Sequence, residues 1–297
     1  MTRIGIILGS TRPGRRGEQV ARWVEERAAP RGDAEFEVID LLDHPLPHLD
    51  ELPGEYRHPH TRVWSARIAS FDGFVVVTPE YNHSVPGVLK NALDFLHEEW
   101  RNKAIGFVSY GGAGGARAVE QLRLACGALE MADVSAQVTL PLATEFEDFT
   151  TLTPSEHAVG ALDRLLDQVV AWSVALAPQR EARGREADET EIRKHLGKIV
   201  DGIRAKDLDV LRRLYSDDVV SFDVEPPLQH AGVDAKLKNW EGAFAILQNL
   251  DYEMRDLTLT VGGTVAFGHC FGRLSGTTNA GVATDGMWVR ATFCLRK

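Results

Sequence analysis

The sequence has few of the residues and patterns that mark several common classes of protein. Only three of its 297 residues are cysteines, Cys126, Cys270 and Cys294, and they are too few and too scattered for a disulfide framework or a metal site. No apolar run is long enough to span a membrane and no signal peptide is recognisable, so a cytoplasmic location is expected. A formal net charge of −10 argues against non-specific binding to nucleic acid, because that binding needs excess positive charge.

The first turn of the chain, residues 9–17, lacks both common nucleotide signatures, the Gly-Lys-Ser/Thr ending and the G-x-G-x-x-G spacing. Instead, an apolar run at residues 4–8 gives way to glycines, hydroxyls and arginines, and a helical period follows at residues 18–28. This order places a helix N-terminus, with its free N–H groups, against a basic loop. The pattern fits a terminal phosphate such as that of FMN; a surface turn with incidental arginines is the alternative.

Further strands are predicted at residues 35–41, 74–78, 104–109 and 134–140, with helices between them and after the last. Five strands that alternate with helices predict an α/β fold with a parallel, doubly wound sheet. Ligands bind at the carboxyl ends of such strands. The loops at residues 9–17, 79–87 and 109–115 all lie on that edge, and their convergence is what a cofactor site requires.

Three separated stretches resemble the NADPH-dependent FMN reductase family: Gly9-Ser10-Thr11-Arg12-Pro13-Gly14-Arg15, Pro79-Glu80-Tyr81-Asn82-His83-Ser84 through Leu89-Lys90-Asn91-Ala92-Leu93-Asp94, and Ser109-Tyr110-Gly111-Gly112. The resemblance covers about residues 1–178. It implies a flavodoxin-like fold with strand order 2-1-3-4-5 and a dimer with FMN near the subunit interface.

The resemblance also implies which residues bind the cofactor. Carried over by motif, Ser10, Arg12, Arg15, Arg16 and Gly17 hold the FMN phosphate, Pro79, Glu80, Tyr81 and Asn82 border the isoalloxazine ring, and Ser109, Tyr110, Gly111 and Gly112 line its other side. No catalytic side chain is expected in this half, because the cofactor carries the chemistry. Glu80 lies inside the flavin-bordering turn, so it is expected to structure that loop and not to act as a general acid.

These expectations describe an NAD(P)H-dependent reductase that passes electrons through FMN to a free flavin, quinone, azo compound, metal ion or oxygen. NADPH is the expected donor, because positive charge beside the flavin suits a 2′-phosphate. Two alternatives stay open: an electron carrier without nicotinamide activity, and a natural-product tailoring protein in which the second half is the working cyclase, isomerase or hydroxylase. A homodimer or a dimer of dimers is expected, with Leu89, Leu93, Phe95 and Leu96 as the dimer contact.

A proline- and histidine-rich loop is expected at residues 43–59, followed by a helix capped by Thr61. Its histidines, His44, His48, His58 and His60, lack a recognised ligand spacing, so no metal is predicted and loop or capping roles are expected. Residues 179–190 contain almost nothing that could enter a core and are expected to form a solvated linker. This divides the chain into domains at residues 1–178 and 191–297.

The second half is predicted to be α+β, because helices near residues 191–203, 208–214 and 234–247 are followed by strands at 251–261, 264–274 and 286–295. Gly262 and Gly263 are the expected hairpin turn. The stretches Asp217-Asp218-Val219, Pro226-Pro227 and Arg290-Ala291-Thr292, with Gly232, resemble the SnoaL-like and ketosteroid-isomerase-type cone fold.

That resemblance implies a small apolar ligand with an acid or base inside the cone. The candidates are Asp223, His230 and His269, each with a structural role as the alternative, and Trp240 and Trp288 are expected as core or pocket wall. The family normally adds a strand after the Arg-x-Thr strand, whereas this chain stops at Arg296-Lys297. A cone open on one side is therefore expected, completed by pairing between subunits or reduced to a dimerisation module.

Overall fold

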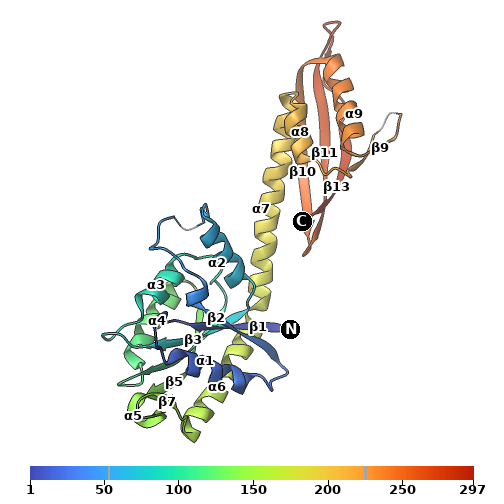
Figure 1. Cartoon of the computed structure of the whole chain (residues 1–297). Helices are drawn as coiled ribbons and strands as arrows, with labels where there is room; N and C mark the ends of the chain where they lie inside the picture. Colours follow the sequence, from blue (N-terminus) through green and yellow to red (C-terminus); the bar gives the residue numbers. More distant parts are fainter. Residues whose placement is uncertain (53, 224–225) are drawn as a thin grey trace. The chain divides into compact units, whose positions relative to one another are not determined.

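The computed structural model describes residues 1–52, 54–223 and 226–297 of the chain (Figure 1). The chain divides into two units, Met1–Glu181 and Ala182–Lys297. Among the described residues, no helix combines the length and the apolar character that crossing a membrane would need. All three cysteines are free thiols.

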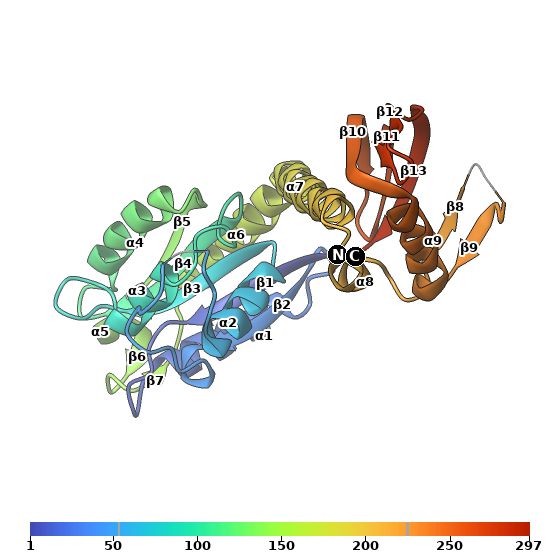
Figure 2. The same ribbon diagram turned by 90° about the horizontal axis from the view of Figure 1, so that it is seen from above.

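The first unit is built on a five-stranded parallel sheet in the order β2-β1-β3-β4-β5, which confirms the flavodoxin-like order (Figure 2). Its strands are β1 (Thr2–Leu8), β2 (Ala34–Asp40), β3 (Gly73–Pro79), β4 (Ala104–Gly111) and β5 (Ala132–Pro141). Every residue of the central strand β3 is buried, as suits an unbroken run of phenylalanine and valine in a sheet covered on both faces.

Helices pack on both faces of this sheet. On one face lie α1 (Gly17–Ala28) and α6 (Glu156–Ala175), and on the other lie α2 (Pro59–Ala69), α3 (Gly87–Asp94) and α4 (Ala116–Ala128). Short elements connect them: η1 (Leu41–Asp43), α5 (Leu142–Glu145), β6 (Phe146–Glu147) and β7 (Thr151–Leu152). The edge of the sheet at the carboxyl ends of the strands is left to the loops.

The apolar side chains expected to form a dimer contact belong instead to the core of the first unit. Leu89, Leu93 and Leu96 are each 1% exposed and Phe95 is 2% exposed. All four pack in the cluster beneath α2, α3 and α4. The dimer contact expected through them is therefore wrong, because all four side chains are already buried within one chain.

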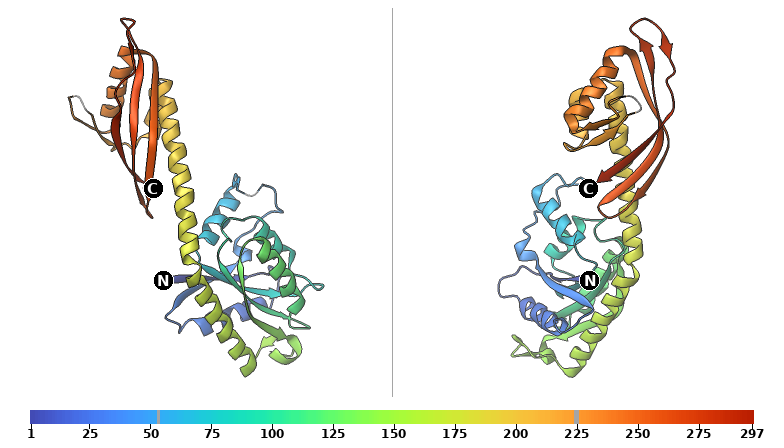
Figure 3. Two further views of the ribbon diagram at one scale, coloured as in Figure 1. Left: turned by 180° about the vertical axis from the view of Figure 1, so that it is seen from behind. Right: turned by 90° about the vertical axis from the view of Figure 1, so that its right-hand side faces the viewer.

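The second unit combines helices with an antiparallel sheet. It contains most of α7 (Ala177–Arg204), then α8 (Leu208–Leu214), β8 (Val220–Phe222), β9 (Gln229–Ala231), α9 (Val233–Ile246), β10 (Leu247–Val261), β11 (Val265–Thr278), β12 (Ala283–Thr284) and β13 (Val289–Arg296). Helices cover one face of the sheet formed by β10, β11 and β13 (Figure 3). The expected α+β class is confirmed.

Two local features differ in detail from the sequence analysis. Residues 179–190, expected to form a solvated linker, belong to the continuous helix α7, and none of them is buried. Alanine, glutamate and arginine are strong helix formers, and ion pairs one turn apart, such as Arg193 with Glu189 at 2.7 Å, add to that preference. The hairpin turn is centred on Gly263 and Thr264, because the Gly262 amide already donates to the Val265 carbonyl at 2.9 Å.

Strand β13 pairs with β11 on one side, and the part of the chain that the structure describes places no strand on its other side. The outer face of β11 carries Val265, Phe267 and Phe271, which are 50%, 56% and 47% exposed. Alternate residues, such as Ala266 and Cys270, are buried against the helices. The sheet thus has one covered face and one open face, as the alternation in the sequence indicates.

A buried cation lies at the amino ends of the strands of the first unit. Lys103 is 5% exposed, and its ammonium group donates to the Ile68 carbonyl at 2.8 Å. Arg180, near the start of α7, donates to the Asp72 carboxylate at 2.9 Å and to the Asn102 carbonyl at 3.1 Å. Burial and the charge of Arg180 together lower the pKa of Lys103 to about 7.

Replacing Lys103→Met should remove a pH-dependent contribution to stability. Between the pKa of about 7 in the folded chain and the ordinary value of 10.5, the unfolded chain holds the proton more tightly, so the free energy of unfolding should rise with pH. The rise is at most on the order of 4 kcal/mol. Urea unfolding at pH 7 and pH 10 measures the free energy of unfolding of both proteins. From pH 7 to pH 10 it should rise more for wild type than for the variant. A difference between the two proteins that does not change with pH would contradict the lowered pKa of Lys103.

Candidate cofactor site

Three loops meet at the carboxyl edge of the parallel sheet. They follow the neighbouring strands β1, β3 and β4, and each leads into a helix: α1, α3 or α4. Because the strands are parallel and adjacent, the loops at residues 9–16, 80–86 and 112–115 lie on one edge, as expected from the sequence.

Direct hydrogen bonds join these loops to one another. The Gly9 amide donates to the Val77 carbonyl of β3 at 2.9 Å. The buried hydroxyl of Ser10 shares a hydrogen bond of 2.9 Å with the phenol of Tyr81. The Glu80 amide donates at 3.1 Å to the carbonyl of Tyr110 in β4, the strand that leads into the third loop, so the bases of the three loops are linked into one rim.

Tyr110 fixes the start of α1 and does not face the edge with its ring. Its side chain is buried, and its hydroxyl accepts a hydrogen bond from the Gly17 amide. A Cβ atom on Gly17 would lie 2.8 Å from that hydroxyl oxygen and 2.6 Å from Leu8 Cδ1, so a larger residue would have to displace one of these two buried side chains. Burial raises the pKa of Tyr110, which keeps the phenol protonated. The N-terminus of α1 is thereby held beside the first loop.

The three arginines of the first loop have different environments. Arg12 is exposed. Arg15 is 5% exposed, and its guanidinium donates to Asp40 at 2.8 Å and to Glu18 at 3.0 Å. Arg16 donates from Nε to the carbonyl of Phe149. The sequence reasoning treated the three alike and missed Asp40, whose signal was an acidic residue at the end of the strand beside β1.

The second loop contains a tight two-residue turn. Tyr81 and Ser84 exchange backbone hydrogen bonds of 2.9 and 3.0 Å. The two central residues, Asn82 and His83, have φ angles of +51° and +65°, in the left-handed region. Two successive positive φ values define a type I′ turn, whose shape is rigid. The position of Tyr81 opposite Ser10 therefore depends on this turn.

Glu80 joins the second loop to the third. Its side chain is 7% exposed and accepts a hydrogen bond of 2.7 Å from Arg117 Nε and one of 3.3 Å from the Arg117 amide, in the first turn of α4. Burial alone would raise the pKa of Glu80, but the hydrogen bond and the charge of Arg117 outweigh it and lower that pKa. An ionised, paired carboxylate suits the expected loop-structuring role, and Arg117 is a partner that the sequence reasoning missed.

The other residues expected beside the flavin ring differ in whether their side chains or their backbone atoms reach the surface. Pro79 is buried at the end of β3, and the buried Ser109 hydroxyl donates to the Gly114 carbonyl at 2.8 Å, which closes the third loop. Gly112 is exposed, and a Cβ atom there would meet no heavy atom within 4 Å. Gly111 and Gly112 thus present backbone, without side chains, at the edge.

The histidine-rich loop brings Asp50, Glu51 and His58 together, with one ligand atom from each within 4.8 Å of the others. Glu51 already accepts the amides of Arg57 at 2.6 Å and His58 at 3.2 Å, and the hydroxyl of Thr61. These bonds hold the two residues before α2, which begins at Pro59, and Thr61 in its first turn. The N-cap of α2 is His58, so the expectation that Thr61 caps this helix is wrong.

In the second unit, the structure brings two of the three acid or base candidates together. Ser221 is paired opposite His230 in the β8–β9 hairpin, so Ser221, His230 and Asp223 share one of its faces. Asn239 of α9 donates to the Asp223 carboxylate at 2.7 Å. His269 instead lies on the open face of β11, paired opposite Thr258 and Thr292.

The two tryptophans have structural surroundings. Trp240 donates to the hydroxyl of Tyr215 at 3.1 Å and stacks on Phe244 within the helix-covered core. Trp288 lies against the guanidinium groups of Arg255 and Arg273, each 4.7 Å from its ring centroid.

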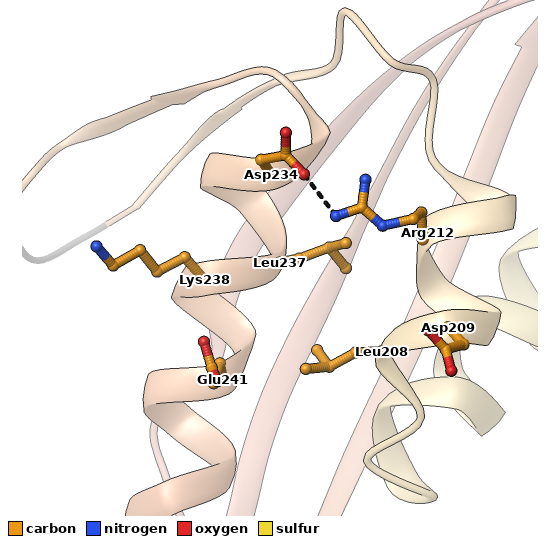
Figure 4. Close-up of a pocket in the computed structure, with 7 residues that line it drawn as sticks. All are labelled: Leu208, Asp209, Arg212, Asp234, Leu237, Lys238 and Glu241. Carbon is orange, nitrogen blue, oxygen red and sulfur yellow. Dashed lines mark hydrogen bonds and ion pairs between the residues drawn. The ribbon is translucent and has the colours of Figure 1, made fainter.

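A pocket of about 330 Å³ lies between α8 and α9 (Figure 4). Leu208 and Leu237 face each other across it, and Arg212 and Asp234 are paired at one end. A second pocket of about 340 Å³ is lined by α7, the turn after β10 and the end of β13. Asp223, His230 and His269 line neither pocket.

Comparison with known proteins agrees with the division of the chain. Residues 2–145 match the NADPH-dependent FMN reductase family, and residues 192–297 match the SnoaL-like domain family. An NAD(P)H-dependent FMN reductase of Schizosaccharomyces pombe is 42% identical over 148 residues, which are 47% of this chain and 74% of that protein.

Two further relatives match the same half. An NAD(P)H-dependent FMN reductase of a Nectria species is 36% identical over 163 residues, 51% of this chain and 81% of that protein. A 2-hydroxy-1,4-benzoquinone reductase of a Burkholderia species is 33% identical over 136 residues, 43% of this chain and 72% of that protein. With this identity over most of each relative, the chain belongs to the NADPH-dependent FMN reductase family, and it carries a SnoaL-like domain after the reductase part.

Proposed function

We propose that this protein is an NAD(P)H-dependent reductase that passes electrons from a nicotinamide, through FMN, to a small acceptor such as a quinone or a free flavin. The observation that carries the proposal is the rim of three hydrogen-bonded loops beside the N-terminus of α1. The family relationship supplies the reaction class, and relatives named as FMN and quinone reductases suggest the class of acceptor.

The groups at the first loop fit a phosphomonoester. The N-terminus of α1 offers backbone N–H groups and a positive dipole end, and the Ser10 and Thr11 hydroxyls and the exposed Arg12 lie in the loop before it. Because the Tyr110 hydroxyl already accepts the Gly17 amide, we assign the FMN phosphate to Ser10, Arg12 and the loop amides that precede Gly17.

The second and third loops would hold the flavin ring. The rigid turn after Pro79, with Glu80, Tyr81 and Asn82, would border one side, and the backbone from Ser109 to Gly112 the other. Bound FMN would accept a hydride from the nicotinamide and pass electrons to the acceptor. The chain's own contribution is to orient the ring and to balance the negative charge of Glu80 beside it, since Arg117 pairs with that carboxylate. No catalytic side chain is assigned.

The finer assignments rest on the family relationship and on position in the chain. NADPH is the proposed donor, because the family to which the chain belongs is named as NADPH-dependent. We propose domains at residues 1–178 and 191–297, with the SnoaL-like domain as an accessory module. A cytoplasmic location remains a prediction.

We also propose a homodimer that forms through the first unit. Leu42, Leu49 and Val88 are 57%, 44% and 43% exposed. The Leu49 amide binds the side chain of Asn91 on α3 at 3.1 Å, and η1 contacts α3, so the three apolar side chains lie in one region. A shared apolar surface there would be removed from water by a second copy.

Purified protein should show a flavin absorption band that bleaches when NADPH is added under nitrogen. Arg12→Ala should weaken FMN binding roughly tenfold, because a charge-assisted hydrogen bond to the phosphate is lost, while riboflavin binding stays unchanged. Arg22→Ala is the control, because Arg22 is an exposed arginine on α1, outside the first loop. Fluorescence titration measures both affinities, and equal loss for FMN and riboflavin would count against the phosphate assignment.

Steady-state kinetics should be ping-pong, because one cofactor alternately meets donor and acceptor at the same edge. Double-reciprocal plots of rate against NADPH at several quinone concentrations should give parallel lines, with kcat/KM higher for NADPH than for NADH. Intersecting lines would indicate a ternary complex and a different arrangement of substrates. A preference for NADH would remove only the choice of NADPH as the donor.

The double variant Leu49→Asp, Val88→Asp should dissociate the homodimer, because two carboxylates would be buried without partners in the contact. Light scattering of the full chain at micromolar concentration should give twice the mass of one chain for wild type and the mass of one chain for the variant. Val63→Asp, at an exposed valine of α2, is the control. A dimeric double variant would show that the contact lies elsewhere.

A further inference from the structure

Arg15 has almost no free hydrogen-bonding capacity. Its Nη1 donates to Asp40 Oδ1 at 2.8 Å and also to the Ser10 carbonyl, its Nη2 donates to Asp40 Oδ2, and its Nε donates to Glu18 at 3.0 Å. A guanidinium has five N–H donors, and these bonds use four of them. The side chain is only 5% exposed, whereas Arg12 in the same loop is exposed.

Asp40 is itself held in place. It is the last residue of β2, and its Oδ1 accepts the Leu42 amide at 2.9 Å, which caps η1. Its side chain is 21% exposed. The Asp40 carboxylate is thus held by the Leu42 amide, and it accepts two hydrogen bonds from the Arg15 guanidinium in a bidentate ion pair.

We propose that Arg15 is a positioning residue and not a phosphate ligand, and that Asp40 is the residue that holds it. Through its bond to the Ser10 carbonyl, the pair sets the direction of the backbone between Ser10 and Arg12, and with it the amides and the Ser10 hydroxyl that would meet a phosphomonoester. The inference rests on the proposed function, in which this loop binds FMN.

The two roles for Arg15 predict opposite effects of the same change. If Arg15 bound the phosphate directly, Asp40 would compete for it, and removal of the carboxylate charge would strengthen FMN binding. If Arg15 positions the loop, the same removal loosens the loop and weakens FMN binding. The loss of a negative charge near a phosphate would by itself strengthen FMN binding. Weaker FMN binding in the variant therefore cannot be explained by charge alone and supports the positioning role.

The experiment compares wild type with Asp40→Asn, and uses Asp43→Asn as the matched control. Asp43 is exposed on η1, and its replacement makes the same change in charge without touching Arg15. Asp40→Asn should raise the Kd for FMN roughly tenfold and leave the Kd for riboflavin unchanged, because riboflavin has no phosphate. At saturating FMN, kcat should stay at the wild-type value. Asp43→Asn should bind both flavins as wild type does.

Thermal unfolding of each variant shows whether the fold is kept. If Asp40→Asn does not fold, Arg15→Lys decides, because lysine keeps the charge that a phosphate needs but loses the two-point bond to Asp40. The inference expects weaker FMN binding in Arg15→Lys, and wild-type FMN binding would overturn it.

Other outcomes separate the two levels of the proposal. Equal or tighter FMN binding by Asp40→Asn would overturn the positioning role alone. An equal loss for FMN and riboflavin would also overturn it, since that pattern means general damage. If wild type itself binds FMN no better than riboflavin, the assignment of the loop to FMN phosphate fails first.

Discussion

The position of β1 between β2 and β3 is the constraint on which the site depends. It places the end of β2, with Asp40, on one side of the first loop and the end of β3, with Tyr81, on the other. The loop is therefore held from both flanks before any ligand arrives. A different strand order would leave the same residues in the sequence without partners.

The parallel sheet and its ligand-binding edge could be predicted from the sequence because they depend on local patterns. The buried run of β3, the glycine-rich loops and the alternation of strands and helices together predict the sheet and its ligand edge. Partners that lie far apart in the chain could not be predicted. Arg15 and Arg16 are adjacent, yet one binds Asp40 and the other the carbonyl of Phe149, 133 residues away.

The sequence also could not show which apolar side chains are buried inside one chain. The apolar residues around α3 have a period that suits either a core or a contact between subunits, and only the packing of neighbouring helices shows that they are core. In the second unit, alternation predicted two faces for β11 but not which one the helices cover. For that reason His269 looked equivalent to Asp223 in the sequence, although it lies on the open face.

The course of α7 has a consequence for any attempt to separate the two units. Arg180 lies beyond the last sheet-covering helix of the first unit, yet it holds Asp72 and the Asn102 and Ser173 carbonyls. A chain that ended at residue 178 would lose this guanidinium and would expose the amino ends of the strands around Lys103. Fragility of such a fragment would then reflect a missing anchor of the reductase itself, because Arg180 belongs to the unit Met1–Glu181.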